Sequence, residues 1–359
     1  MRTSIVIATH NEGENLAKTV HTVCEQINPG SCEVVVVDDA STDNSLAAVK
    51  DFPQVRIDRF PQRVGVARAK HQAAQLASGE ILIFLDGHCK PEPGALDRIV
   101  ENVELADGQA VITPRICSLN VDNWQIDYQQ TGHGYCTRLD SMQCHWLDPQ
   151  QMVPRRLGRE RELFESPNLQ GCALGVSRQL YQRLRGFDTG MLSWGSEDVD
   201  FGVKVWLMGH AILHDPDCSV GHRYQASFDR YTVKGEHVLA NQMRMARKHL
   251  SEQVWDDWLV RFGARHPQKL WLASWKLFQR YRETVEEDRE FLMTNRLFDE
   301  FWYAGKFQLD WPALAGGDED EEEEQEAIPF PGHTPSPSPS PSGSPRGLRR
   351  DYVATAVVR

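Results

Sequence analysis

The segment IFLDGHCKPEPG, residues 83–94, places an aspartate and a histidine two positions apart directly after an apolar run. In an extended chain residues i and i+2 point to the same side, so Asp86 and His88 converge on one point. A carboxylate with an imidazole suits Mn²⁺, and to a lesser degree Zn²⁺, better than Mg²⁺. An aspartate that caps the next turn would give the same letters, so the pair alone is a weak motif.

A third candidate ligand is His222, in the segment CSVGHRY at 218–224, which follows the apolar run AILHDPD. A lone histidine near a strand end is usually structural. It becomes a candidate metal ligand because Asp86 and His88 leave a coordination position to fill.

Two further carboxylates lie in WGSEDVDFGVKVWLMGH, residues 194–210. Apolar residues at helical spacing from Val199 onward put Glu197 and Asp198 in the first turn of a helix and Ser196 at its N-cap. Acids there complement the helix dipole without any catalysis. The functional alternative is a carboxylate aimed into a cleft as general base or acceptor anchor. The local pattern does not choose between them.

The run VVVVDDASTD, residues 34–43, ends a strand-like segment in two aspartates. Such a strand end is a natural place to hydrogen-bond a nucleoside. Asp and Ser also favour turns for their own reasons, so turn chemistry explains the same pattern.

The elements that must position these residues alternate along 1–115. Strand-like runs lie within 4–10, 32–39, 55–60 and 80–88, and helix-period segments lie within 11–27 and 65–77. This alternation predicts an α/β fold with a mostly parallel central sheet covered on both faces. Ligands of such sheets bind beyond the carboxyl ends of the strands, where ATHNE, DDASTD and DGH fall.

The rest of the chain divides by composition. Residues 116–225 are irregular, and 229–311 turn helical with tryptophan pairs at helical spacing that predict an apolar face packed on the body. Residues 316–359 are acidic and then rich in Pro and Ser, which predicts disorder. We therefore expect a catalytic domain over 1–225, made of a nucleotide-binding half (1–115) and an acceptor and metal half (116–225). A helical extension over 226–315 and the tail 316–359 follow.

Bulk properties exclude some classes of protein. The net charge is −12 without a Lys/Arg block, which argues against nucleic acid as a partner. The first strand-like run begins at residue 4 and no window of ~18 residues is wholly apolar, so we expect neither a signal peptide nor a transmembrane segment. Eight cysteines without CxxC pairs are expected to be reduced thiols in a cytoplasm.

Taken in order, these motifs resemble the GT-A glycosyltransferases, which use nucleotide sugars. The opening SIVIATHNEGENL…VVVVDDASTDNS is similar to the large inverting family 2 typified by bacterial polysaccharide synthases. The block FLDGHCKPEPGAL…WGSEDVDFGVKVW…CSVGHRY resembles the polypeptide N-acetylgalactosaminyltransferases and, in part, the β-1,4-galactosyltransferases. The resemblance covers about residues 3–250, and the D-x-H, W-G-x-E and V-G-H elements agree although they are far apart in the chain.

The resemblance implies a GT-A fold with a helical C-terminal extension and a role for each matched residue. It implies an Mn²⁺ site of Asp86, His88 and His222, and a UDP-sugar donor. The donor-binding set it implies is Thr9, Asp39, Arg68 and Asp86. The catalytic set it implies, at the donor sugar and acceptor, is Trp194, Glu197 and Asp198. The implied reaction transfers GalNAc, or Gal or GlcNAc, from the UDP-sugar to a hydroxyl of a peptide, such as Ser or Thr, or of a glycan.

The sequence departs from the pattern of the polypeptide transferases in two respects, which leaves more than one function open. Asp198 stands where the polypeptide transferases have asparagine, and SEDVD resembles the EDxD of inverting enzymes, whose aspartate takes the acceptor proton. An Asp198 base implies inversion, whereas the D-x-H and V-G-H elements resemble those of the retaining family. The membrane anchor, stem and lectin domain of the Golgi enzymes have no counterpart here, which predicts a soluble relative of bacterial type. A nucleotide-sugar or glycan binding protein without catalysis is the alternative from another class, although the intact site residues argue against it.

Overall fold

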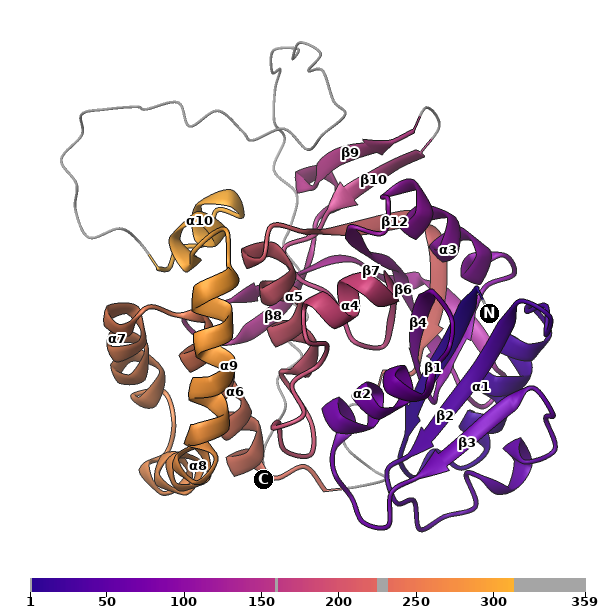
Figure 1. The fold of residues 1–359 in the computed structure, drawn as a ribbon, viewed down its shortest axis with the longest axis horizontal. Helices are drawn as coiled ribbons and strands as arrows, with labels where there is room; N and C mark the ends of the chain where they lie inside the picture. The colour runs from indigo at the N-terminus through magenta and orange to yellow at the C-terminus, as the bar shows by residue number, and fades with distance from the viewer. Residues whose placement is uncertain (1, 159–160, 225–231, 313–359) are drawn as a thin grey trace.

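The computed structural model describes residues 2–158, 161–224 and 232–312. Its first part is the predicted alternation of strands and helices (Figure 1). The elements are β1 (Thr3–Thr9), α1 (Glu14–Cys24), β2 (Cys32–Asp38), the short 3-10 helix η1 (Ala47–Val49), β3 (Val55–Arg59), α2 (Val66–Leu76) and β4 (Ile81–Asp86). These four strands pair in parallel in the order β3-β2-β1-β4. The central strands β1, β2 and β4 are buried along almost their whole length, as apolar runs without alternation require.

Beyond β4 the sheet becomes mixed. The next elements are β5 (Cys89–Pro91), α3 (Ala95–Leu105), β6 (Ala110–Asn120), β7 (Gln125–Arg138), β8 (Gln143–Leu147), η2 (Pro149–Gln151), β9 (Val153–Leu157), β10 (Arg161–Glu165), β11 (Ala173–Ser177), α4 (Arg178–Arg183), α5 (Glu197–Leu207) and β12 (Ala211–His222). The sheet continues from β4 as β11-β6-β12-β10-β9. Strand β11 runs antiparallel to β4, whereas β6 and β12 are parallel to each other. The expected α/β fold of GT-A type is confirmed, with its parallel half at residues 3–86.

The helical region consists of α6 (Gly235–His249), α7 (Glu252–Gly263), α8 (Gln268–Arg280), α9 (Arg282–Asn295) and α10 (Glu300–Lys306). These helices gather on one side of the molecule, away from β1–β3 (Figure 1). Trp255 and Trp258 are buried in the core, and Trp258 donates its indole N–H to Leu139 O of the sheet domain. Trp271 and Trp275 are only half-buried, so the first tryptophan pair carries more of the predicted apolar contact.

Three other expectations concern the tail, membrane crossing and the cysteines. The predicted disordered tail, 316–359, lies outside the described residues. Within the described ranges, no helix combines the length and the apolar character that crossing a membrane requires. All eight cysteines are free thiols.

Candidate metal centre and active site

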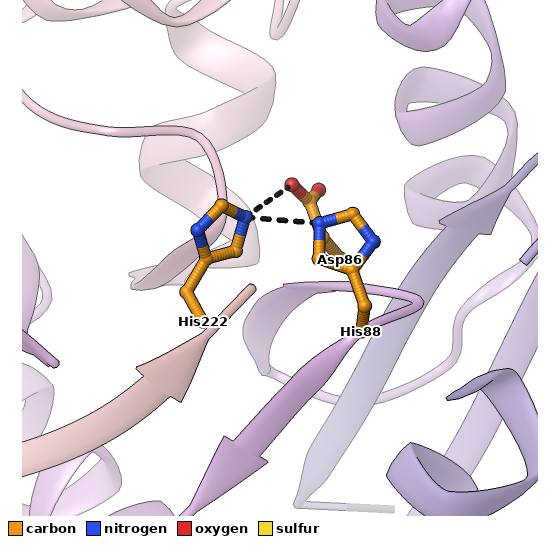
Figure 2. A group of neighbouring side chains, drawn as sticks. All are labelled: Asp86, His88 and His222. Atoms are coloured by element: carbon orange, nitrogen blue, oxygen red, sulfur yellow. Dashed lines mark hydrogen bonds and ion pairs between the residues drawn. The ribbon is translucent and has the colours of Figure 1, made fainter. Parts of the chain in front are cut away.

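The three expected metal ligands come together because of how two strand ends meet. Strand β4 ends at Asp86, the chain turns at Gly87 and His88, and β5 then pairs antiparallel with β12. In that register His222 lies opposite Cys89, so the end of β12 is beside the Asp86–His88 turn. Figure 2 shows the three side chains pointing toward one another.

The geometry of this triad fits a divalent cation. His222 Nε2 lies 3.0 Å from His88 Nε2 and 3.6 Å from Asp86 Oδ2 (Figure 2). One ligand atom from each residue lies within 4.8 Å of the other two, and no other such cluster occurs in the described part of the chain. Two imidazole nitrogens that face each other beside a carboxylate form a donor set for Mn²⁺ or Zn²⁺.

The surroundings favour the ligand forms of Asp86 and His222. Burial favours a neutral Asp86, but Lys70 and the two histidines hold the pKa of Asp86 below its ordinary value, so it is a carboxylate. Burial lowers the pKa of His222 although Asp86 opposes this effect, so its ring is neutral at pH 7. Ligating nitrogens need a lone pair and ligating oxygens a charge, and His222 and Asp86 meet these requirements.

Glu12, just after β1, orients His88. Its Oε1 lies 3.0 Å from His88 Nδ1, which leaves His88 Nε2 facing the other two ligands. Burial favours the uncharged ring, but ion pairing with Glu12 raises the pKa of His88. A carboxylate behind a ligating histidine fixes the ring and its tautomer. A Cβ on Gly87 would lie 3.0 Å from Glu12 Cγ, so the glycine leaves room for this contact.

Lys70 of α2 links the triad to Glu197, and the sequence analysis missed it. Its Nζ lies 3.3 Å from Asp86 Oδ1 and 3.4 Å from Glu197 Oε1, and it donates to Gly171 O at 2.9 Å. Burial opposes its charge, yet Asp86 and Glu197 raise the pKa of Lys70 above its ordinary value. Its helical spacing with Ala73 and Ala74 places Lys70 on the buried face of α2, which signals a buried cation but does not name its partners.

The residues expected at the nucleotide lie at the ends of β1 and β2. Thr9 is buried and its Oγ1 has no hydrogen-bond partner among the described residues. The Asp39 carboxylate accepts from Val64 N at 2.6 Å and from Gly65 N at 3.0 Å, which fixes the start of α2. Arg63 Nε lies 3.8 Å from Asp39 Oδ2. Arg68 lies on the exposed face of α2, and its expected uridine contact remains a prediction.

Glu197 and Asp198 begin α5 as expected, but they differ in environment. Burial and the neighbouring Asp198 raise the pKa of Glu197 to about 7, against the opposing effect of Lys70. Asp198 Oδ2 accepts from Gly171 N at 3.0 Å, and its Oδ1 accepts from Val199 N at 2.9 Å. Ser196 takes the N-cap position as expected, but with φ 72° its side chain makes no capping hydrogen bond.

An aromatic row, Tyr224, Trp146 and Tyr135, extends from the metal triad. The Tyr224 ring centroid is 4.8 Å from that of His222 and 6.5 Å from that of Trp146, which is 5.1 Å from that of Tyr135. Trp146 covers Gly132, where a Cβ would come within 2.3 Å of the indole. These residues lie on β7, on β8 and after β12, and no local pattern in the sequence joins them.

The fold and this site define a GT-A glycosyltransferase. The family model described as glycosyl transferase family 2 matches residues 4–185, just over half of the chain. The chain therefore belongs to glycosyl transferase family 2. A second model, described as the N-terminal domain of galactosyltransferase, matches residues 160–228, the segment that contains Glu197 and His222.

Similar proteins point to one group of enzymes. The chain is 31% identical to polypeptide N-acetylgalactosaminyltransferase 10 of Homo sapiens over 286 residues, which are 76% of this chain and 45% of that protein. It is 31% identical to polypeptide N-acetylgalactosaminyltransferase 4 of Mus musculus over 278 residues, 74% of this chain and 46% of that protein. The chain thus spans about half the length of the curated relatives it matches.

Solved structures agree with the fold. A crystal structure of GalNAc-T7 with UDP, GalNAc and Mn²⁺ has a TM-score of 0.65 at 25% identity, covering 86% of this chain and 57% of that one. Staphylococcus aureus TarS 1–349 in complex with UDP-GlcNAc has a TM-score of 0.51 at 17% identity, covering 81% of this chain and 84% of that one. The second likeness concerns the fold alone.

Proposed function

We propose that this protein is an Mn²⁺-dependent glycosyltransferase that transfers GalNAc from UDP-GalNAc to a hydroxyl acceptor, with protein Ser or Thr as the favoured acceptor. Transfer of Gal or GlcNAc, or transfer to a glycan hydroxyl, are the alternatives within the same chemistry. The observation that carries the proposal is the Asp86–His88–His222 triad at the end of β4. The named activity of the relatives and the UDP, GalNAc and Mn²⁺ in the GalNAc-T7 structure support the choice of donor and metal.

Asp86, His88 and His222 would hold the metal. When bound, Mn²⁺ supplies Lewis-acid chemistry that neutralises the charge of a leaving diphosphate. Glu12 keeps the His88 ring in the orientation that this role requires. Lys70 keeps Asp86 ionised and holds it at a fixed distance from Glu197.

The remaining site residues would place the two substrates. Thr9, Asp39 and Arg68 are assigned to the uridine, with the free Thr9 hydroxyl as a hydrogen-bond donor. Trp194 and Glu197 are assigned to the donor sugar and acceptor. The aromatic row suits the acceptor, because ring faces stack on sugars and on apolar peptide side chains.

The test is UDP release from a panel of UDP-sugars, with peptide and glycan acceptors, with and without Mn²⁺. We expect metal-dependent release from UDP-GalNAc, lost in His222→Ala and retained in His133→Ala. The control residue belongs to a separate histidine pair with His214, 3.3 Å away. UDP release that is the same with and without Mn²⁺, and the same in His222→Ala, would contradict the proposal. Metal-dependent UDP binding without release from any donor would favour the nucleotide-sugar binding protein.

An inverting reaction with Asp198 as general base is the second candidate, favoured by the match to family 2. Two backbone N–H groups already occupy the Asp198 carboxylate, which supports a positioning role instead. We therefore expect Asp198→Asn to lower kcat by no more than about 100-fold, because loss of a general base typically costs 10²–10⁴-fold. Near-complete loss of transfer with UDP binding retained, and an inverted anomer in the product, would establish the inverting reaction.

The proposal also covers the domain boundaries and the cellular compartment. Residues 1–225 would form the catalytic domain, with its nucleotide-binding half at 1–115, and 226–315 the helical extension. The cytoplasmic and bacterial setting remains a proposal; the eight free thiols are what a reducing compartment favours.

A further inference from the structure

The loop from Leu192 to Ser196 carries Trp194 and leads directly into Glu197. Its backbone is unusual, because Ser193, Gly195 and Ser196 all have positive φ, at 43°, 97° and 72°. L-residues seldom adopt such conformations, and they persist only where surrounding contacts enforce them. The contacts that enforce them here come from two directions.

The nucleotide-binding half supplies the first contact. Val66 N, at the start of α2, donates to Ser193 O at 2.9 Å. A Cβ on Gly65 would lie 2.8 Å from Ser193 N, so the two backbones meet without space for a side chain. Asp39 holds the other side of this turn through Val64 N and Gly65 N.

The helical extension supplies the second contact, through one side chain of α6. The Asn241 amide oxygen accepts from Leu192 N at 2.7 Å. Its amide nitrogen donates to the carbonyls of Leu192 at 2.8 Å, of Gly195 at 3.0 Å and of Trp194 at 3.3 Å. Asn241 is 1% exposed, so these contacts form away from water. One turn earlier on α6, His237 Nδ1 lies 2.9 Å from Ser193 Oγ.

We infer that Asn241 is a positioning residue that fixes the Trp194 loop and the start of α5, and that the helical extension is thereby part of the catalytic unit. This inference rests on the proposed function, since positioning has a kinetic consequence only if Trp194 and Glu197 meet the substrates. Asn241 touches none of the metal ligands, so it acts on the donor sugar and acceptor side of the site. Small misplacements of reacting groups cost far more in rate than in ground-state binding.

The most direct variant is Asn241→Asp, which keeps the acceptor for Leu192 N but removes both amide hydrogens and faces the three carbonyls with a charge. We expect kcat for transfer to fall on the order of 10-fold to 100-fold, with UDP affinity in Mn²⁺ unchanged. Backbone hydrogen exchange across 192–196 should accelerate on the order of 10-fold, because the loop loses its donors. His237→Ala, which removes a single contact to the same loop, should give a smaller loss in the same direction.

The matched control is Met243→Ala, which truncates a fully buried apolar side chain of the same helix. It should lower Tm while leaving kcat and exchange across 192–196 unchanged at a temperature where the protein is folded. The inference is overturned if Asn241→Asp lowers kcat no more than this control, or weakens UDP binding as much as it lowers kcat. Should Asn241→Asp not fold, His237→Ala decides by the same criteria. If the wild type transfers no sugar the proposed function fails, whereas the exchange measurement still tests whether Asn241 holds the loop.

Discussion

At the scale of single residues, the metal triad depends on a carboxylate that is not a ligand. Glu12 lies 3.0 Å from His88 Nδ1 and thereby sets which ring nitrogen faces Asp86 and His222. We predict that Glu12→Gln lowers Mn²⁺ affinity by about 10- to 100-fold, the usual cost of losing such a partner. Calorimetric titration with Mn²⁺ measures this. The control is Glu14→Gln at the first residue of α1, two positions after Glu12, and this variant should bind Mn²⁺ like the wild type.

Glu197 makes the stability of the metal-free protein depend on pH. Its pKa is raised from 4.5 to about 7 by burial and by Asp198, so the folded state binds this proton more tightly than the unfolded state. The stabilisation is complete below about pH 4.5 and is lost as the pH rises through about 7, a change of about 3 kcal/mol.

Urea unfolding of the metal-free protein at pH 5 and pH 8 measures this effect. The free energy of unfolding should fall more across this interval for the wild type than for Glu197→Gln, which cannot ionise. Equal changes in the two proteins would show that Glu197 is an ordinary carboxylate in the folded state.

At the scale of elements, helix α6 joins the helical extension to the sheet domain through buried polar contacts. Lys248 Nζ lies 2.5 Å from Asp188 Oδ2 and 2.7 Å from Asp200 Oδ1 of α5, and Arg244 also pairs with Asp188. Arg244 and Lys248 lie three and seven residues after Asn241, so all three share one face of α6. The extension is therefore held by buried charges as well as by tryptophan packing.

Removing the central cation of this network should be costly. Lys248→Met leaves Asp188 and Asp200 buried with fewer partners, and we predict a loss of about 3–5 kcal/mol in the free energy of unfolding. Arg261→Ala breaks the exposed Arg261–Asp257 pair and should cost less than about 1 kcal/mol. A Lys248→Met protein as stable as the Arg261→Ala protein would show that the buried network contributes little.

The sequence predicts these elements unevenly. Apolar runs such as Ile81–Leu85 identify the parallel strands, and the D-x-H and V-G-H segments locate the triad, because each signal lies within a few residues. Glu12, Lys70 and Asn241 could not be assigned roles this way. Each acts through a contact with a distant segment, and the pairing of β5 with β12 or the docking of α6 is set by tertiary packing.

At the scale of the whole molecule, every residue proposed to contact the metal or a substrate lies between positions 9 and 224, and the helices that support them end at Lys306. We predict that deletion of 316–359 leaves metal-dependent UDP release and Tm unchanged. The full chain and the shortened chain are compared with the same donor and acceptor. A loss of UDP release at unchanged Tm would assign the deleted segment a part in substrate binding.

The central claim is that Asp86, His88 and His222 hold one divalent cation for a UDP-sugar, and direct titration of Mn²⁺ in the presence of UDP tests it most simply. The wild type should bind one Mn²⁺ per chain, and His222→Ala should weaken that binding by at least about 100-fold. His133→Ala should bind as the wild type does. Equal Mn²⁺ affinity in the wild type and in His222→Ala would contradict the metal site and, with it, the proposed metal-dependent use of a UDP-sugar.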